Sequence, residues 1–232
     1  MKQYEAVIFD MDGVIFDSER CVLDCWIKIA EKYGIRDIER SFLACTGTNK
    51  ERTREIMIEE YGSDFPYDRF SKEASKLFHD KYDNGNLPVK PGVNEILTFL
   101  KNEKKKIALA SSTRREIVLS QLRDAGVLDY FDEVVTGDMV TKSKPDPEIF
   151  LLACRKIGVT PDKSYAIEDS YNGVRSASRG GLMTIMVPDL LPADDEMKGL
   201  SEIVLDSLYD VVDFLAKEIH VREEEKELFC EI

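Results

Sequence analysis

The feature that most constrains this sequence is a repeated alternation of short apolar runs with helical patterns. Each run has the length of a strand, and several are rich in valine and isoleucine, as expected for strands covered on both faces. The predicted strands are Tyr4–Asp10, Lys106–Ser111, Glu133–Thr136, Ser164–Glu168, Met183–Val187 and Ile203–Leu205. Strand, helix and strand in succession predict an α/β fold with a mostly parallel, doubly wound sheet.

Helical patterns between these runs have clear ends. An apolar stripe that includes Ile117 and Ala125 stops at Gly126, and a second stripe starts after Pro147 and stops at Gly158. Proline at the first helical position and glycine just past the last one are typical of helix boundaries. These patterns predict helices that connect successive strands of the sheet.

One long segment has helical patterns and no strand pattern. It extends from about Phe16 to Tyr82 and is followed by the turn-forming stretch Asp83-Asn84-Gly85-Asn86. We therefore predict two domains, an all-helical one formed by residues 16–87 and a Rossmann-like core formed by residues 1–15 and 88–232. The charge-rich end, residues 217–232, predicts a solvated helix.

Composition excludes several classes of protein. The 232 residues carry 32 Lys and Arg against 45 Asp and Glu, which gives a net charge of −13. Such an acidic surface repels nucleic acid and anionic lipid, so neither is an expected partner. No stretch has the 18 or so apolar residues of a spanning helix, and the N-terminus has no apolar signal segment. We expect a cytoplasmic monomer.

The five cysteines favour reduced, buried thiols. Cys21 and Cys25 lie one helical turn apart and form a conceivable metal pair, but the chain has no CxxC pattern and two histidines. Widely spread cysteines in a chain of cytosolic character are typical of free thiols, and a zinc site is not expected.

Polar and charged residues gather where the predicted strands end. Asp10 and Asp12 follow the first strand, two residues apart, so that both carboxylates point to one side if the strand continues. Ser111 ends the second strand, and Ser112 follows it and precedes a helix, whose free backbone N–H groups bind anions. Each segment alone also fits an ordinary interpretation, a solvated strand end or a helix cap.

Two later segments complete the set. Lys144 lies in a loop just before the helix that starts near Pro147, and in isolation it fits a surface charge. Glu168 and Asp169 end a buried strand, and two acids there require a counter-charge such as Mg²⁺. Because ligands bind beyond the carboxyl ends of parallel strands, we expect all four segments to share one edge of the sheet.

Together these residue types suit phosphoryl transfer through a covalent aspartyl phosphate. A carboxylate nucleophile forms an acyl phosphate that is labile enough to be released in a second step. Mg²⁺ and a lysine neutralise the repulsion between the attacking anion and the phosphate dianion. The expected cofactor is therefore Mg²⁺, and the expected partner is a small phosphorylated metabolite.

The motifs DMDGVIFDS, ASST, SKPDPEIF and IEDSYNGVRSA occur in that order, and with them the chain resembles the haloacid dehalogenase superfamily. The likeness is to the β-phosphoglucomutase-like branch, which has a helical cap. It implies that Asp10 is the nucleophile, that Asp12 is the general acid/base, and that Lys144 pairs with Asp10 and the phosphate. The implied phosphate-binding residues are Ser111 and Ser112, and the implied metal ligands are Asp10, the backbone carbonyl of Asp12, Asp169, and Glu168 as ligand or neighbour.

The same resemblance implies that residues 16–87 are a cap that closes over the substrate and excludes water. Mutases of this branch have a histidine where this sequence has Val22, and a Lys-Gly pair where it has Thr46-Gly47. Gly47 and Lys50 are the candidate substrate-binding residues of the cap. Without the histidine and one cation, we expect a phosphatase acting on a sugar or nucleoside-type monophosphate.

Two alternatives stay open at this stage. The first is a β-phosphoglucomutase-like sugar phosphomutase. The second is a phospho-accepting signalling module similar to a response-regulator receiver, which also has a doubly wound sheet and a metal-bound aspartate. The position of Asp10 on the first strand and the helical insert count against the receiver.

Overall fold

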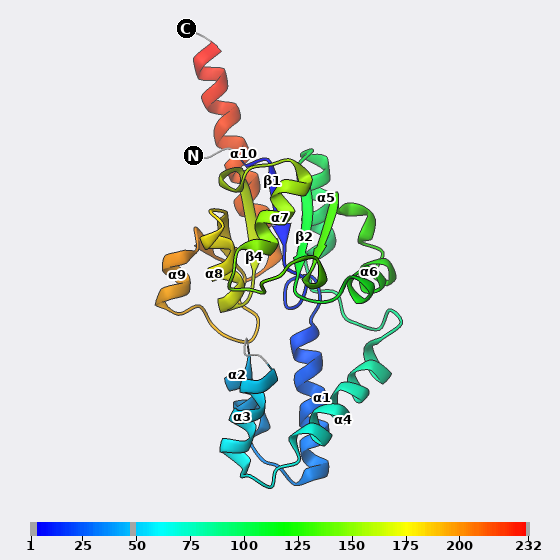
Figure 1. The fold of residues 1–232 in the computed structure, drawn as a ribbon. Coiled ribbons are helices and arrows are strands. Elements are labelled where there is room, and N and C mark those ends of the chain that lie inside the picture. The colour runs from blue at the N-terminus through cyan, green and yellow to red at the C-terminus, as the bar shows by residue number, and fades with distance from the viewer. Residues whose placement is uncertain (1–3, 47–49, 231–232) are drawn as a thin grey trace.

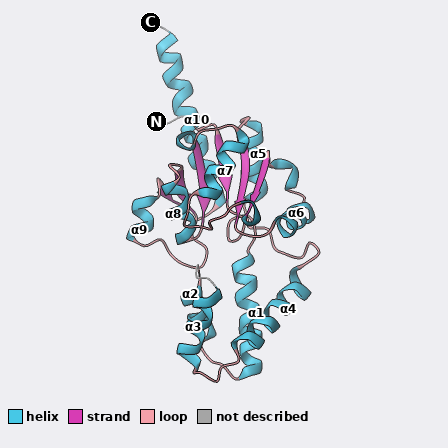
Figure 2. Ribbon diagram, viewed as in Figure 1, coloured by secondary structure: helices cyan, strands magenta, loops and turns pink. Residues whose placement is uncertain are grey.

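The computed structural model of the chain describes residues 4–46 and 50–230, with side chains described up to residue 219. Six parallel strands form one sheet in the order β3-β2-β1-β4-β5-β6 (Figures 1 and 2). The strands are β1 (Ala6–Phe9), β2 (Lys106–Ser111), β3 (Glu133–Thr136), β4 (Ser164–Glu168), β5 (Met183–Met186) and β6 (Ile203–Val204). The predicted doubly wound α/β fold is confirmed.

The strand order reverses at β1, which pairs with β2 on one side and with β4 on the other. In open α/β sheets the ligand site lies at such a switch point, beyond the carboxyl ends of the strands. Strand β1 is shorter than predicted and ends at Phe9. Asp10 therefore starts the loop, although its backbone N–H still donates to the carbonyl of Ile167 at 3.0 Å.

Helices cover both faces of the sheet, because alternate strand residues point to opposite sides. Val7 and Phe9 belong to one hydrophobic cluster, with residues of α5, α6 and α10, whereas Ile8 belongs to another with residues of α7 and α8. The helices are α5 (Val93–Asn102), α6 (Arg115–Asp124), α7 (Glu148–Ile157), α8 (Tyr171–Arg179), α9 (Asp195–Leu200) and α10 (Leu208–Cys230). The sequence patterns did not single out α5 and α9.

Four helices form a separate bundle at the carboxyl edge of the sheet, which we call the helical region (Figure 1). Its members are α1 (Ser18–Tyr33), α2 (Ile38–Cys45), α3 (Lys50–Tyr61) and α4 (Tyr67–Tyr82). They enclose a hydrophobic cluster of their own. At its centre Trp26 packs edge-on against Phe42 and Phe70, with ring centroids 5.1 and 5.3 Å apart.

Two short linkers join the helical region to the sheet, and they form a ribbon. Phe16 and Val89 are paired antiparallel, the N–H of Asp17 donates to the carbonyl of Pro88 at 2.9 Å, and the N–H of Lys90 donates to the carbonyl of Ile15 at 2.9 Å. The chain thus enters and leaves the helical region at one place. Any rotation of this region relative to the sheet must bend the ribbon.

Two further observations concern the predictions from composition. In the part of the chain that the structure describes, no helix combines the length and apolar character that a membrane crossing needs. Cys21, Cys25, Cys45 and Cys154 are buried and are not joined in disulfide bonds.

Candidate active site

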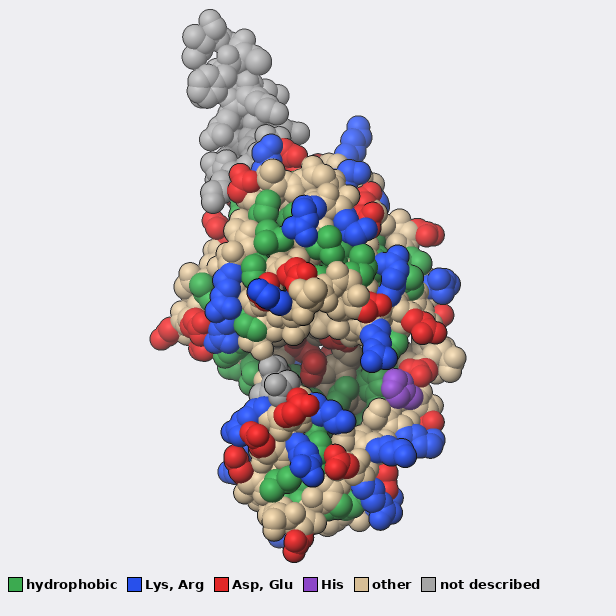
Figure 3. Space-filling model, viewed as in Figure 1, with side chains coloured by type: hydrophobic (Ala, Val, Ile, Leu, Met, Phe, Trp, Pro, Cys, Tyr) green, Lys and Arg blue, Asp and Glu red, His purple; other side chains and the backbone are tan. Residues whose placement is uncertain are grey.

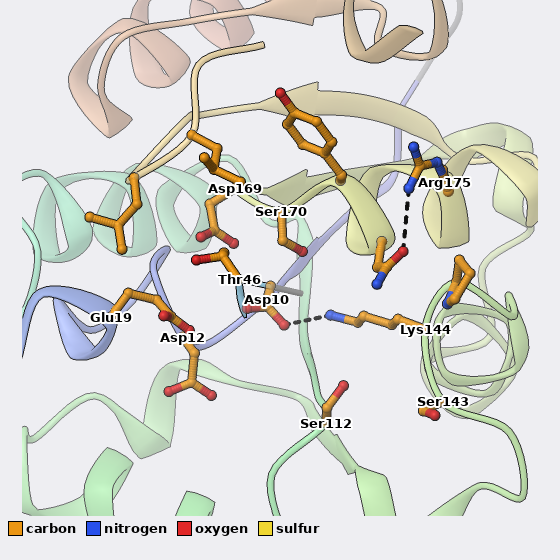
Figure 4. A pocket seen from close by; sticks show the side chains of 15 residues that line it. Asp10, Asp12, Glu19, Thr46, Ser112, Ser143, Lys144, Asp169, Ser170 and Arg175 are labelled. Atoms are coloured by element: carbon orange, nitrogen blue, oxygen red, sulfur yellow. Dashed lines mark hydrogen bonds and ion pairs between the residues drawn. The ribbon is translucent and has the colours of Figure 1, made fainter. Parts of the chain in front are cut away.

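A cleft of about 780 Å³ lies between the carboxyl edge of the sheet and the helical region. Figure 3 shows the hollow between the two parts of the molecule, with acidic side chains inside it. Asp10, Asp12 and Asp169 line it from the strand ends, and Glu19 and Thr46 line it from the helical region. All of these side chains appear in the close view of Figure 4.

The first strand delivers two carboxylates with different surroundings. Asp10 is buried and is paired with Lys144. Asp12 accepts one hydrogen bond from the hydroxyl of Ser18 at 2.8 Å and one from the hydroxyl of Thr113 at 3.1 Å. Asp12 is therefore held by two neutral donors, while Asp10 faces a cation.

Lys144 links the first and the fourth strands of the sheet. Its ammonium group donates to Asp10, to the carbonyl of Ala110 at 3.0 Å and to the carboxylate of Glu168 at 2.6 Å. The lysine side chain is 8% exposed, so the loop lysine of the sequence is not a surface charge. It neutralises part of the negative charge at the floor of the cleft (Figure 4).

Glu168 is fixed in place from several sides. It is fully buried, and besides Lys144 it accepts hydrogen bonds from the N–H of Ser170 at 3.4 Å and from its hydroxyl at 3.1 Å. A Cβ atom on Gly173 would lie 1.9 Å from its carboxyl group, so glycine is required where α8 passes the carboxylate. The neighbouring Asp169 is partly buried and lines the cleft.

Burial dominates the electrostatics of these acids. It raises the pKa of Asp10 to about 8, with Lys144 opposing the rise and Glu168 adding to it. Burial also raises the pKa of Asp12, against the hydrogen bonds from Ser18 and Thr113, and that of Asp169, to which Glu168 adds. Burial therefore shifts each of these carboxyl groups toward its protonated form, and a nearby cation opposes that shift.

The opposite holds for Lys144. Burial acts to lower its pKa, but the adjacent charges of Asp10 and Glu168 outweigh that effect and raise the pKa above its usual value. The lysine therefore stays positively charged across the physiological pH range.

The acidic cluster fits a hard divalent cation. Carboxylate oxygens of Asp10, Glu168 and Asp169 all lie within 4.8 Å of one another. Carboxylate oxygens are the ligands that Mg²⁺ prefers. In the described part of the chain, Lys144 forms ion pairs with two members of this cluster, Asp10 and Glu168. One lysine does not neutralise three carboxylates, so a further cation would balance the charge. The residues present therefore suit Mg²⁺.

The other predicted site residues are placed differently. Ser112 lines the cleft, whereas Ser111 is fully buried at the end of β2 and its oxygen accepts from the N–H of Thr113 at 3.1 Å. Lys50 begins α3, is exposed, and is not among the described residues that line the cleft. Gly47 lies outside the described residues.

The structure adds residues that motif reasoning missed. Glu19 points into the cleft from α1, and burial raises its pKa to about 7, with Asp12 and Asp189 adding to the rise. Arg175 lies on α8, where its guanidinium pairs with Glu196. The position of Glu19, directly after the first motif, was a usable signal. No pattern in the sequence predicted that Leu190 and Leu191 line the cleft.

Comparison with known proteins agrees with this geometry. The phosphorylated carbohydrates phosphatase of Thermotoga maritima is 36% identical over 185 residues, which cover 78% of this chain and 83% of the relative. The β-phosphoglucomutase of Bacillus subtilis is 31% identical over 220 residues, covering 89% and 94%. The crystal structure of CbbY from Rhodobacter sphaeroides in complex with phosphate superposes with a TM-score of 0.67 at 27% identity, covering 89% and 95%.

A family model matches residues 7–187, which include the helical region, strands β2 to β5 and all of β1 except Ala6. The model is that of the haloacid dehalogenase-like hydrolases, and the acidic cluster and Lys144 both lie within the matched range. The chain belongs to the haloacid dehalogenase-like hydrolases.

Proposed function

We propose that this chain is a Mg²⁺-dependent phosphatase that hydrolyses a small phosphorylated carbohydrate through an aspartyl phosphate on Asp10. The observation that carries the proposal is the contact of Lys144 with both Asp10 and Glu168 at the floor of the cleft. The similarity to a phosphatase of phosphorylated carbohydrates supports this substrate class.

The first step transfers the phosphoryl group to the protein. A carboxylate oxygen of Asp10 attacks the phosphorus, and the bond from phosphorus to the ester oxygen breaks. Asp12 donates a proton to that oxygen, and the alcohol leaves. Burial raises the pKa of Asp12 and so favours its protonated form, as the role of proton donor requires.

The second step releases phosphate. Asp12, now ionised, accepts a proton from a water molecule as that water attacks the phosphorus, and the bond to Asp10 breaks. Ser18 and Thr113 hold the Asp12 carboxyl in place through both steps.

Positive charge at the cleft floor assists both transfers. Lys144 reduces the repulsion between Asp10 and the phosphate oxygens. Asp10, Asp169 and the backbone carbonyl of Asp12 would hold Mg²⁺, with Glu168 beside it, and the bound ion would supply Lewis-acid stabilisation of the phosphate charge.

We further propose that residues 16–87 act as a cap over a core formed by residues 1–15 and 88–232. The helical region has its own hydrophobic cluster, and the ribbon formed by the two linkers is its connection to the sheet. Both features support movement of this region as a rigid body. Closure would bring Glu19 and Thr46 onto the substrate and exclude bulk water.

Hydrolysis is favoured over phosphomutase activity by the side chains of the cap. Val22 packs against the hydrophobic cluster of the helical region and has no proton to transfer. Among residues 4–46 and 50–219, no histidine lines the cleft. The similarity to a β-phosphoglucomutase makes sugar-phosphate isomerisation the alternative to test.

The test incubates the purified protein and Mg²⁺ with a panel of phosphorylated sugars and nucleoside monophosphates. Inorganic phosphate and sugar-phosphate isomers are measured in the same samples. Asp10→Asn should abolish phosphate release, and Asp162→Asn, an exposed position before the amino end of β4, is the matched control. Isomerisation without phosphate release would establish the mutase instead, and an active Asp10→Asn variant would refute the covalent mechanism.

A further inference from the structure

The loop between β5 and α9, residues 187–194, carries a buried carboxylate that the proposed chemistry does not use. Asp189 has a fully buried side chain, yet it lies in a surface loop. The ammonium group of Lys90 donates to its Oδ1 atom at 2.7 Å, and the Nε of Arg20 donates to the same oxygen at 3.3 Å. Lys90 lies in the connection between the helical region and the sheet, and Arg20 lies at the start of the helical region.

The two cations come from the two different crossings of the chain. Lys90 lies on the returning linker, and Arg20 lies in the first turn of α1, directly after the outgoing linker. Asp17 completes the group, because its carboxylate lies 3.4 Å from Arg20 and 3.8 Å from Lys90. We call these four residues, Asp17, Arg20, Lys90 and Asp189, the linker cluster. It contains two acids and two bases.

The loop that carries Asp189 is also attached to the cleft and to the helical region. Leu190 and Leu191 line the cleft, and Leu190 packs against the hydrophobic cluster of the helical region. The hydroxyl of Tyr171, on α8, donates to the carbonyl of Pro192 at 2.7 Å. One short loop therefore contacts the linkers, the helical region and a helix of the core.

The energetics of the linker cluster favour a role in orientation over a role in stability. The Oδ2 atom of Asp189 is buried without a hydrogen-bond partner among the described residues, and the buried Oδ1 atom of Asp17 has the longer ion-pair contacts with Arg20 and Lys90 but no hydrogen bond among them. A buried carboxylate with one unsatisfied oxygen is a poor source of folding stability, because its desolvation offsets the Coulombic gain. What Asp189 does supply is a contact that joins the returning linker and the start of α1 to one loop of the core.

We propose that Asp189 is a positioning residue that sets the orientation of the cap, by anchoring both linkers to the loop that lines the cleft. This inference rests on the proposed function for its kinetic consequence, although not for its structural one. When Asp189 loses its charge, Lys90 and Arg20 lose their shared anchor. The cap then samples orientations in which Glu19 and Thr46 are away from the substrate.

The experiment compares Asp189→Asn, which preserves size but removes the charge, with Asp195→Asn. Asp195 is the matched control because it follows the same loop, is fully exposed, and has one weak contact, with Lys198 at 3.8 Å. Hydrogen exchange is measured at the amides of Asp17 and Lys90, whose hydrogen bonds close the ribbon. We expect these two amides to exchange about tenfold faster in Asp189→Asn, with β1 unchanged. No change in Asp195→Asn is expected.

Kinetics supply the second measurement. For the sugar phosphate that the wild type hydrolyses fastest, KM should rise about tenfold in Asp189→Asn, because apparent affinity falls with the fraction of competent cap. For p-nitrophenyl phosphate, which lacks the sugar hydroxyl groups, kcat/KM should stay within about threefold of the wild type. A merely destabilising substitution would affect both substrates equally and would speed exchange throughout the chain.

A double-mutant cycle tests the stated partner. If Lys90 acts through Asp189, the variant carrying both Asp189→Asn and Lys90→Gln should be no more impaired than either single variant. Additive effects, or linker amides that exchange as in the wild type, would overturn the inference. If the protein hydrolyses none of the esters, the proposed function is refuted. The hydrogen-exchange measurement still tests whether Asp189 anchors the two linkers.

Discussion

Gly13 offers the sharpest test of the site geometry, because two separate constraints act on it. Its φ angle is +81°, a left-handed conformation that costs a non-glycine residue roughly 1–2 kcal/mol. A Cβ atom there would also lie 2.1 Å from the Oδ2 atom of Asp169 and 2.6 Å from its Cγ atom. In Gly13→Ala the carboxylate of Asp169 must therefore move.

The size of that movement sets the expected loss. Favourable contacts between non-bonded atoms lie at about 3.5 Å, so Asp169 has to shift by about 1 Å. A misplacement of about 1 Å at a reacting centre costs about 10²-fold in rate. We therefore expect kcat/KM of Gly13→Ala to fall about 100-fold, and the affinity for Mg²⁺ to fall with it.

Gly34 provides the matched control. It ends α1 with a φ of +66°, and a Cβ atom there would have no atom within 4 Å. Urea unfolding should show a loss of about 1–2 kcal/mol in Gly34→Ala from the backbone strain alone, with unchanged kcat/KM. If Gly13→Ala retained activity within about threefold of Gly34→Ala, the placement of Asp169 against the first motif would be refuted.

Three further predictions test the charge and the packing. Lys144→Met removes the cation that contacts Asp10, so kcat in a phosphate-release assay should fall by about 10²- to 10³-fold. A loss below tenfold would contradict the proposed role of Lys144. Mg²⁺ binding at pH 7 should release protons, because the pKa of metal-free Asp10 is raised to about 8 and a bound cation favours the ionised form. Calorimetry in two buffers of different ionisation enthalpy detects this release, and the affinity should increase from pH 6 to pH 8; equal heats and a pH-independent affinity would argue against it. Phe70→Ala should lower the free energy of unfolding of the helical region by about 3–5 kcal/mol, because Phe70 is fully buried against Trp26. Unfolding is followed by the fluorescence of Trp26, the single tryptophan of the chain, and a decrease below about 1 kcal/mol would contradict this packing.

The sequence alone predicted the sheet and the edge at which its functional side chains meet. The signals were local, since apolar runs of strand length, Pro147 and Gly158 depend on residues close in the chain. Parallel strands joined by helices place all their carboxyl ends at one edge, so four separate motifs could be assigned to one site without coordinates. That is why Asp10, Asp12, Lys144, Glu168 and Asp169 could be predicted to lie together, as the structure places them.

The tertiary structure decided what each of these groups contacts. Lys144 lies 134 residues from Asp10 in the chain, and its loop position alone indicated a surface charge. The sequence also did not reveal that two hydroxyl groups donate to Asp12 or that Ser111 is fully buried. Nor did it reveal that Lys50 is not among the described residues that line the cleft. Burial and charge pairing sum over neighbours that are remote in sequence, so local patterns do not determine them.

The linker cluster shows the same division most clearly. Nothing in the residues around Asp189 distinguishes it from the other acids of this chain, which carries 45 of them. Its character comes from full burial and from two cations that precede it by 99 and 169 residues. The sequence determined the sheet and the edge at which its polar and charged residues gather, because both follow from local pattern and topology. The contacts of Asp189 with Lys90 and Arg20 depend on the packing of distant segments, which sets desolvation and Coulombic pairing.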